Sequence, residues 1–100
     1  MGEETIKRRM RRAKERASEI LENTGYKIIP SDNSVFCILG VRQKEIRMIR
    51  VVVDKITDQD IKEISAFCPP GICTKEIWCK MPHKIGFVMK EINGSVNNIN

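Results

Sequence analysis

The sequence contains little histidine, few aromatic residues and no long apolar run. His83 is the single histidine, and aromatic residues make up 5% of the 100 positions. No stretch approaches the roughly 18 apolar residues that a transmembrane helix needs, so no membrane span is expected. The first residues are charged and lack the apolar segment of a secretory signal peptide, which predicts a cytoplasmic location.

The cysteines and aromatic residues exclude two further classes of site. The four cysteines lack the paired CxxC spacing of structural zinc, and the one histidine is isolated, so no metal is expected. Cys37 and Cys79 lie in apolar strand patterns typical of small buried side chains. Cys68 and Cys73 flank a Pro-Pro-Gly turn, and the sequence does not decide whether they form a disulfide. Most aromatic residues fall in core patterns, which argues against single-strand binding by base stacking.

Apolar spacing and turn residues predict a single α/β domain over residues 1–92, followed by a polar, flexible tail at 93–100. The order is α-β-β-β-α-β-β, with a mixed central sheet flanked by helices. The predicted elements are a helix from Glu4 to Asn23, strands from Tyr26 to Pro30, Val35 to Leu39 and Glu45 to Val53, a helix from Asp58 to Phe67, and strands from Thr74 to Met81 and Ile85 to Ile92.

Two of these strands carry a recognisable pair of motifs, Phe36-Cys37-Ile38-Leu39 and Ile49-Arg50-Val51-Val52. They resemble the catalytic strands of the PD-(D/E)XK nuclease superfamily, which includes restriction endonucleases and archaeal Holliday-junction resolvases. In that family the first strand reads F-D-I-L and the second I-E-V-K. The resemblance covers roughly Glu15 to Ile92, and the element order is the family's minimal core order. It therefore implies a restriction-endonuclease-like core.

The chain departs from the family at each catalytic strand position. Cys37 replaces the aspartate, Arg50 replaces the glutamate and Val52 replaces the lysine. In the family these carboxylates hold the metal ion and the lysine supports the attacking water. We therefore expect no catalytic residues, no metal and no cofactor. Burying Arg50 without a partner would be costly, so we expect it to form an ion pair with Glu19 or Asp54.

A relocated catalytic site is the alternative for the same face of the domain. Family members often place a metal-assisting glutamate on the first helix, where Glu19 and Glu15 are the candidates and Glu19 is preferred. Asp32 precedes the strand that bears Cys37, and Asp54 shares strand parity with Arg50. Together Glu19, Asp32 and Asp54 would hold Mg²⁺ in a metal-dependent endonuclease.

The predicted first helix concentrates the positive charge of the chain. Residues 7–16 contain seven basic residues and one acidic residue, a net charge of +6 against +5 for the whole chain. Repulsion between like charges on successive turns destabilises a helix, so this run of charge indicates a polyanionic partner. A basic face that is only solvated would have the same sequence pattern. The candidate nucleic-acid-binding residues are Lys7, Arg8, Arg9, Arg11, Arg12, Lys14 and Arg16.

These observations favour a protein that binds nucleic acid, with duplex DNA as the expected partner, through phosphate contacts and without catalysis. The endonuclease with relocated ligands is one alternative, and a structural or interaction subunit of an oligomer is another. Small resolvase-like proteins are often dimers, so the resemblance also allows a homodimer.

Overall fold

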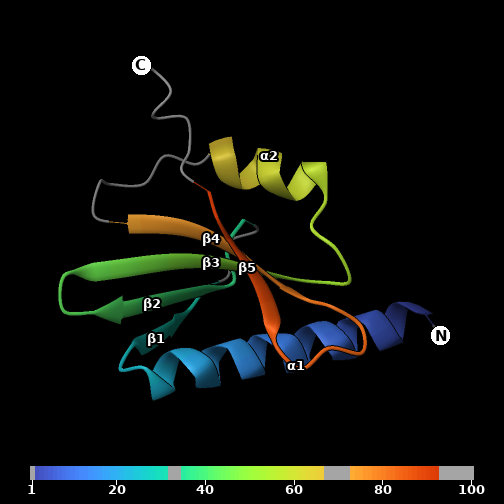
Figure 1. Cartoon of the computed structure of the whole chain (residues 1–100), viewed down its shortest axis with the longest axis horizontal. Coiled ribbons are helices and arrows are strands. Elements are labelled where there is room, and N and C mark those ends of the chain that lie inside the picture. Colours follow the sequence, from blue (N-terminus) through green and yellow to red (C-terminus); the bar gives the residue numbers. More distant parts are fainter. Residues whose placement is uncertain (1, 32–34, 67–72, 93–100) are drawn as a thin grey trace.

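A computed structural model of the chain describes residues 2–31, 35–66 and 73–92 (Figure 1). The predicted α-β-β-β-α-β-β order and the mixed sheet between helices are confirmed. The elements are helix α1 (Gly2–Asn23), strands β1 (Lys27–Pro30), β2 (Ile38–Arg42) and β3 (Glu45–Val53), helix α2 (Asp58–Ala66), and strands β4 (Cys73–Lys80) and β5 (Phe87–Glu91).

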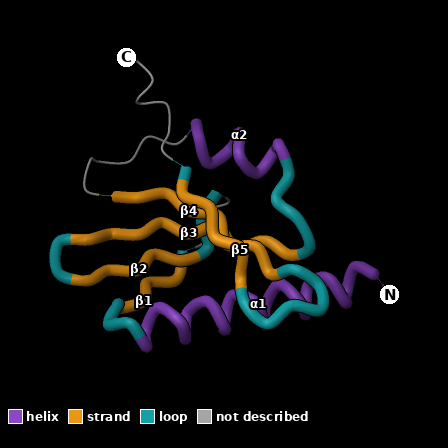
Figure 2. The backbone as a smooth tube through the Cα atoms, in the orientation of Figure 1, coloured by secondary structure: helices purple, strands orange, loops and turns teal. Residues whose placement is uncertain are grey.

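The five strands lie in the sheet in the order in which they follow along the chain. β1, β2 and β3 are successively antiparallel, β3 and β4 are parallel, and β5 returns antiparallel to β4. A parallel pair needs a crossover connection, and α2 lies within it. The backbone trace shows α1 and α2 on opposite sides of the sheet, so the domain has three layers (Figure 2).

Alternating side chains of the strands divide the core into two apolar clusters, one under each helix. The cluster under α1 consists of Ala13, Ala17, Leu21, Tyr26, Ile38, Ile49, Val51 and Trp78. The cluster under α2 consists of Phe36, Val52, Ile64, Ile77, Cys79 and Ile92. Cys79 is therefore a buried apolar side chain, as predicted, and burial raises the pKa of its thiol.

The sequence predicts that Gly25, after Asn23-Thr24, stops the first helix, and α1 does end at Asn23. Gly25 has a φ of 95°, a conformation that glycine adopts without a steric penalty. The N–H of Tyr26 donates to the carbonyl of Leu21, and the N–H of Gly25 donates to that of Glu22, each at 3.0 Å. This pair of bonds is a Schellman motif, and it turns the chain from α1 into β1. Helical spacing predicts that Ile6 belongs to the apolar stripe of this helix, but Ile6 is 51% exposed.

α2 begins with a reciprocal cap. The N–H of Asp60 donates to the Thr57 hydroxyl at 3.1 Å, and the N–H of Thr57 donates to the Asp60 carboxylate at 2.9 Å. Both backbone donors are thereby satisfied at the start of the helix. The sequence predicts a cap at Thr57 or Asp58, and the structure shows it at Thr57. Asp60 is buried by this arrangement.

β2 lies later in the chain than predicted. The sequence predicts that Gly40 ends this strand, but Gly40 lies inside it and pairs with Arg47 of β3. A Cβ at Gly40 would lie 3.5 Å from side-chain carbons of Leu21 and Tyr26. The glycine therefore allows a close approach between the sheet and the end of α1, a role that local turn propensity does not reveal.

Several predicted features lie outside the described residues. They are the tail at 93–100, the Pro-Pro-Gly turn, Cys68 and Asp32. Cys73, the other cysteine beside that turn, is a free thiol.

Candidate functional site

The three positions of the nuclease-like motif lie together. Cys37, Arg50 and Val52 line one small cavity of about 250 Å³ beside Lys14 of α1 and Asp60 of α2. The N–H of Cys37 donates to the carbonyl of Ile49 at 2.9 Å, which aligns the two motifs across the sheet. The cavity thus contains a thiol, a guanidinium group and an aliphatic side chain at the three motif positions.

Arg50 has acidic partners, as predicted, but they are not the predicted ones. Its guanidinium group lies 3.0 Å from Asp60 and 2.9 Å from Glu63, both on α2, and donates to the carbonyl of Val35 at 3.0 Å. The assignment to Glu19 or Asp54 is wrong because Arg50 projects toward α2, whereas those carboxylates pair with α1 arginines on the opposite side of the sheet. Arg50 therefore joins β3 to the capped end of α2.

Asp54 leaves the strand face that its sequence parity predicts. β3 ends at Val53, and Asp54 has a φ of 75°, so strand alternation no longer applies to its side chain. Its carboxylate accepts two hydrogen bonds from the guanidinium group of Arg9. These hydrogen bonds hold the pKa of Asp54 below its ordinary value.

The structure does not bring the relocated ligand set together. Glu19 pairs with Arg16 at 3.0 Å, and Arg9, the partner of Asp54, precedes Glu19 by ten residues on α1. Ten residues span about 15 Å of helix axis. Asp32 lies outside the described residues. Within residues 2–31, 35–66 and 73–92 there is no cluster of three or more histidine, cysteine, aspartate or glutamate residues suited to a metal.

A larger cavity lies between α1 and the β4–β5 turn, and we call it the cleft. Its volume is about 540 Å³. α1 supplies residues spaced i, i+3, i+4 and i+7, which fall on one helical face. Figure 1 shows the β4–β5 turn beside the amino-terminal half of α1. The lining residues are Arg9, Arg12, Ala13, Arg16, Val53, Asp54, Lys80, Met81, Pro82 and His83.

Positive charge exceeds negative charge in the cleft. Four lining side chains carry a permanent positive charge and one carries a negative charge, a net charge of +3 with His83 neutral. Arg9 is neutralised by Asp54, and Arg16 contacts Glu19 in an exposed pair. Arg12 is exposed and has no ionic partner among the described side chains. The cleft therefore offers guanidinium groups to an external anion.

Lys80 organises the wall of the cleft opposite α1. Its ammonium group donates to the carbonyls of Met81 and Lys84, within the turn that follows β4. His83 adopts a φ of 62° in that turn. Sequence analysis missed this wall. The signal available was the run Lys80-Met81-Pro82-His83-Lys84, a turn rich in basic residues.

The predicted basic residues of α1 therefore separate into groups. Arg9, Arg12 and Arg16 line the cleft, and Lys14 lines the cavity of Arg50 instead. The remaining residues, Lys7, Arg8 and Arg11, are exposed and line neither cavity.

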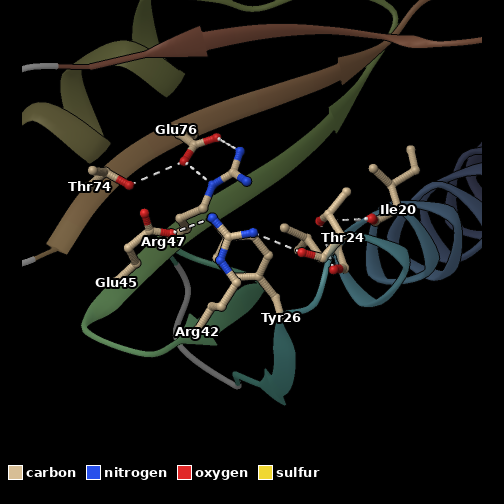
Figure 3. A network of polar contacts seen from close by, with 9 residues as sticks. Ile20, Thr24, Tyr26, Arg42, Glu45, Arg47, Thr74 and Glu76 are labelled. Atoms are coloured by element: carbon tan, nitrogen blue, oxygen red, sulfur yellow. Dashed lines mark hydrogen bonds and ion pairs between the residues drawn. The ribbon is translucent and has the colours of Figure 1, made fainter.

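A second hollow lies on the same side of the sheet, near the β2–β3 turn, and we call it the carboxylate-rich hollow. Its volume is about 560 Å³, and its ionic lining residues are Lys44 and Arg47 against Glu45, Glu76 and Glu91, a net charge of −1. Figure 3 shows how its side chains bond to one another around Arg47 and Glu76.

Arg47 and Glu76 form the centre of this network. Two nitrogens of Arg47 donate to the two oxygens of Glu76, each at 2.7 Å, and the indole of Trp78 donates to the same carboxylate at 2.9 Å. Burial favours a higher pKa for Glu76, but the hydrogen bonds from Arg47 and Trp78 outweigh it and lower the pKa. The guanidinium group of Arg47 also lies over the rings of Tyr26 and Trp78.

Arg42 extends the network to the end of α1. It donates to the carbonyl of Thr24 at 2.9 Å and to Glu45 at 3.1 Å, and it covers the ring of Tyr26. Tyr26 donates its hydroxyl proton to Glu45 at 2.6 Å, a bond that lowers the pKa of Glu45. The arginines here are held by internal partners.

Among the described residues, neither α1 nor α2 has the apolar length needed to span a membrane.

Comparisons with known proteins add no assignment to this geometry. Neither a protein-family model, nor a curated protein, nor a solved structure matches the chain.

Proposed function

We propose that this protein binds nucleic acid through phosphate contacts and does not cut it. The observation that carries the proposal is the net positive charge of the cleft. Asp54 neutralises Arg9, and α1 still presents Arg12 and Arg16 on the side opposite Lys80. Guanidinium groups donate in a fork that matches the oxygens of phosphate. Duplex DNA is the proposed partner because its backbone offers a continuous row of phosphates.

The absence of cutting is proposed from the motif positions. Cys37, Arg50 and Val52 share one cavity, and Arg50 is held there by Asp60 and Glu63. That arrangement places a cation where the resemblance implies a metal-binding carboxylate. The element order, with a parallel β3–β4 pair joined through α2, supports the proposal of a degenerate restriction-endonuclease-like core.

The test measures binding of a fluorescent duplex by anisotropy between low and physiological salt. Contact with about three to five phosphates gives a log–log salt slope of about −2.7 to −4.5. Changing Arg12 and Arg16 to Gln is expected to flatten this slope by up to about 2 and to weaken binding similarly for unrelated sequences.

The matched control changes Arg8 and Arg11 to Gln, which removes the same charge from the same helix outside the cleft. This control is expected to weaken binding less. No binding at low salt, or equal effects of the two double variants, would contradict the assignment of the cleft. Metal-dependent cleavage of DNA or RNA with Mg²⁺ or Mn²⁺ would contradict the non-catalytic part.

A further inference from the structure

The cleft differs in shape from a surface that only follows a duplex. Its 540 Å³ lies within the range of about 300–1,000 Å³ typical of small-molecule sites. It is bounded by α1 on one side and by the β4–β5 turn on the other. Hollows of this kind admit a group that projects into them, whereas the phosphates of an intact duplex lie on its outer surface.

The charged groups in the cleft are concentrated. Arg12 and Arg16 are four residues apart, which is about 6 Å along the helix axis, and both lie on the face that lines the cavity. An intact strand presents singly charged phosphates spaced about 3.4 Å along the axis. A terminal phosphate monoester carries a charge of about −1.5 to −2 on one group at neutral pH. Two arginines on one helical face, Arg12 without an ionic partner and Arg16 in an exposed pair with Glu19, favour the monoester.

Apolar side chains complete the cleft beside the arginines. Ala13, Val53, Met81 and Pro82 contribute carbon surface to the lining. A free phosphate ion would leave that surface without contacts, whereas the sugar and base of a nucleotide would cover it. The lining therefore combines an anion-binding edge with an apolar wall, as a site for a phosphorylated nucleotide requires.

We infer that the cleft binds the phosphorylated end of a nucleic-acid strand. This inference rests on the proposed function and adds a specific ligand to it. Arg12 and Arg16 bind the terminal phosphate, while Asp54 holds Arg9 at the side of the site. Lys80 acts as a positioning residue because its ammonium group is bonded to the carbonyls of Met81 and Lys84 and so fixes the opposite wall.

The experiment compares short duplexes of one sequence that end in a 5′-phosphate, a 3′-phosphate or hydroxyl groups only. At least one phosphorylated duplex is expected to bind about tenfold more tightly than the hydroxyl duplex, as added charge-assisted hydrogen bonds imply. In Arg12→Gln/Arg16→Gln the ratio should fall toward one. In Arg8→Gln/Arg11→Gln both affinities should fall together and the ratio should persist.

Competition separates the sources of phosphate. A nucleoside monophosphate is expected to displace the phosphorylated duplex at lower concentration than inorganic phosphate, because it also covers the apolar wall. Equal competition by the two would overturn the nucleotide-end assignment. Thermal unfolding of each variant confirms that the protein is folded, and the single change Arg12→Gln repeats the test with a smaller perturbation.

The failures of the two proposals are distinguishable. Equal affinity for phosphorylated and hydroxyl duplexes in the parent protein would overturn this inference and leave nucleic-acid binding intact. A preference that survives Arg12→Gln/Arg16→Gln would also overturn it. No binding of any duplex at low salt would overturn the proposed function itself.

Discussion

Two hollows of similar volume lie on the α1 side of the sheet, the cleft and the carboxylate-rich hollow. Both contain arginine, yet their net charges are +3 and −1. In the carboxylate-rich hollow Arg47 is bonded in a fork to Glu76 and covers two aromatic rings. In the cleft Arg12 has no ionic partner among the described side chains. The same residue type therefore stabilises the fold in one hollow and is available to a ligand in the other.

The difference follows from where each arginine is anchored. Arg47 lies within β3, and its side chain is 25% exposed beside a glutamate that is 10% exposed. Desolvated charges of this kind need partners. The cleft arginines lie on a helix flank, where water solvates a cation at little cost. Arginine content alone does not identify a binding surface, whereas the balance of charge around each guanidinium group does.

The largest predicted effect on stability comes from breaking the ion pair between Arg47 and Glu76. Arg47→Met should lower the free energy of unfolding by about 3 kcal/mol, because it leaves Glu76 buried with fewer partners. The value is at the low end of the range for buried pairs since Arg47 retains some exposure. Arg12→Met, the control in the cleft, should change it by no more than about 0.5 kcal/mol. Urea denaturation of both variants measures the contrast, and equal losses would contradict it.

Arg50, on the other side of the sheet, is also a cation held by internal carboxylates, those of Asp60 and Glu63. Arg50→Met should cost about 2 kcal/mol. The loss should be smaller than for Arg47 because Asp60 keeps its bonds from Thr57 and the second partner, Glu63, is within reach of water. Glu63→Gln should cost less still, since Glu63 is 38% exposed. A variant of Arg50 as stable as the parent would show that this ion pair does not hold α2 to the sheet.

Low pH should lower the stability that the ion pairs of Glu76 and Asp60 contribute to the fold. Hydrogen bonds from partners keep the pKa values of Glu76 and Asp60 below their ordinary values, despite opposing burial. The stability they contribute is present above their unfolded-state pKa values, about 4.3 and 3.9, and is lost as pH falls through the lower folded-state values. Urea midpoints should therefore fall progressively below about pH 4 to 5. Glu76→Gln should show a shallower fall, and an unchanged slope would contradict the assignment.

The element order could be predicted from the sequence because apolar periodicity and turn residues are local signals. β3 was predicted with its observed bounds, and the stop at Gly25 and the start of α2 were also predicted. The predicted bounds of β2 lie too early in the chain because Gly40 is inside the strand, where it allows a close contact with Leu21, a residue distant in sequence. From sequence alone, a glycine predicts the end of a strand, and only the packing partner shows that it can lie inside one.

The candidate site was predictable in part. The basic run identified the helix, but its residues could not be assigned to the cleft without the β4–β5 turn that forms the other wall. Strand parity placed Asp54 beside Arg50, and the left-handed backbone at Asp54 overrides parity. The partners of Arg50 on α2 depend on which helix covers which face, and the residue pattern of one strand does not specify this.

The smallest predicted effect concerns the one carboxylate in the cleft. Asp54→Asn should raise the affinity for a phosphorylated duplex about two- to fivefold, in line with the small energies of exposed ion pairs, because it releases Arg9 and raises the net charge of the cleft to +4. Asparagine tolerates the left-handed backbone of this position, so little strain is added. Glu45→Gln, in the carboxylate-rich hollow, removes one carboxylate without changing the cleft and should leave the affinity unchanged. Anisotropy titrations of the two variants at one salt concentration compare them directly. Reduced affinity of Asp54→Asn would show that Asp54 orients Arg9 for the ligand, and equal gains in both variants would mean that overall charge, rather than the cleft, governs binding.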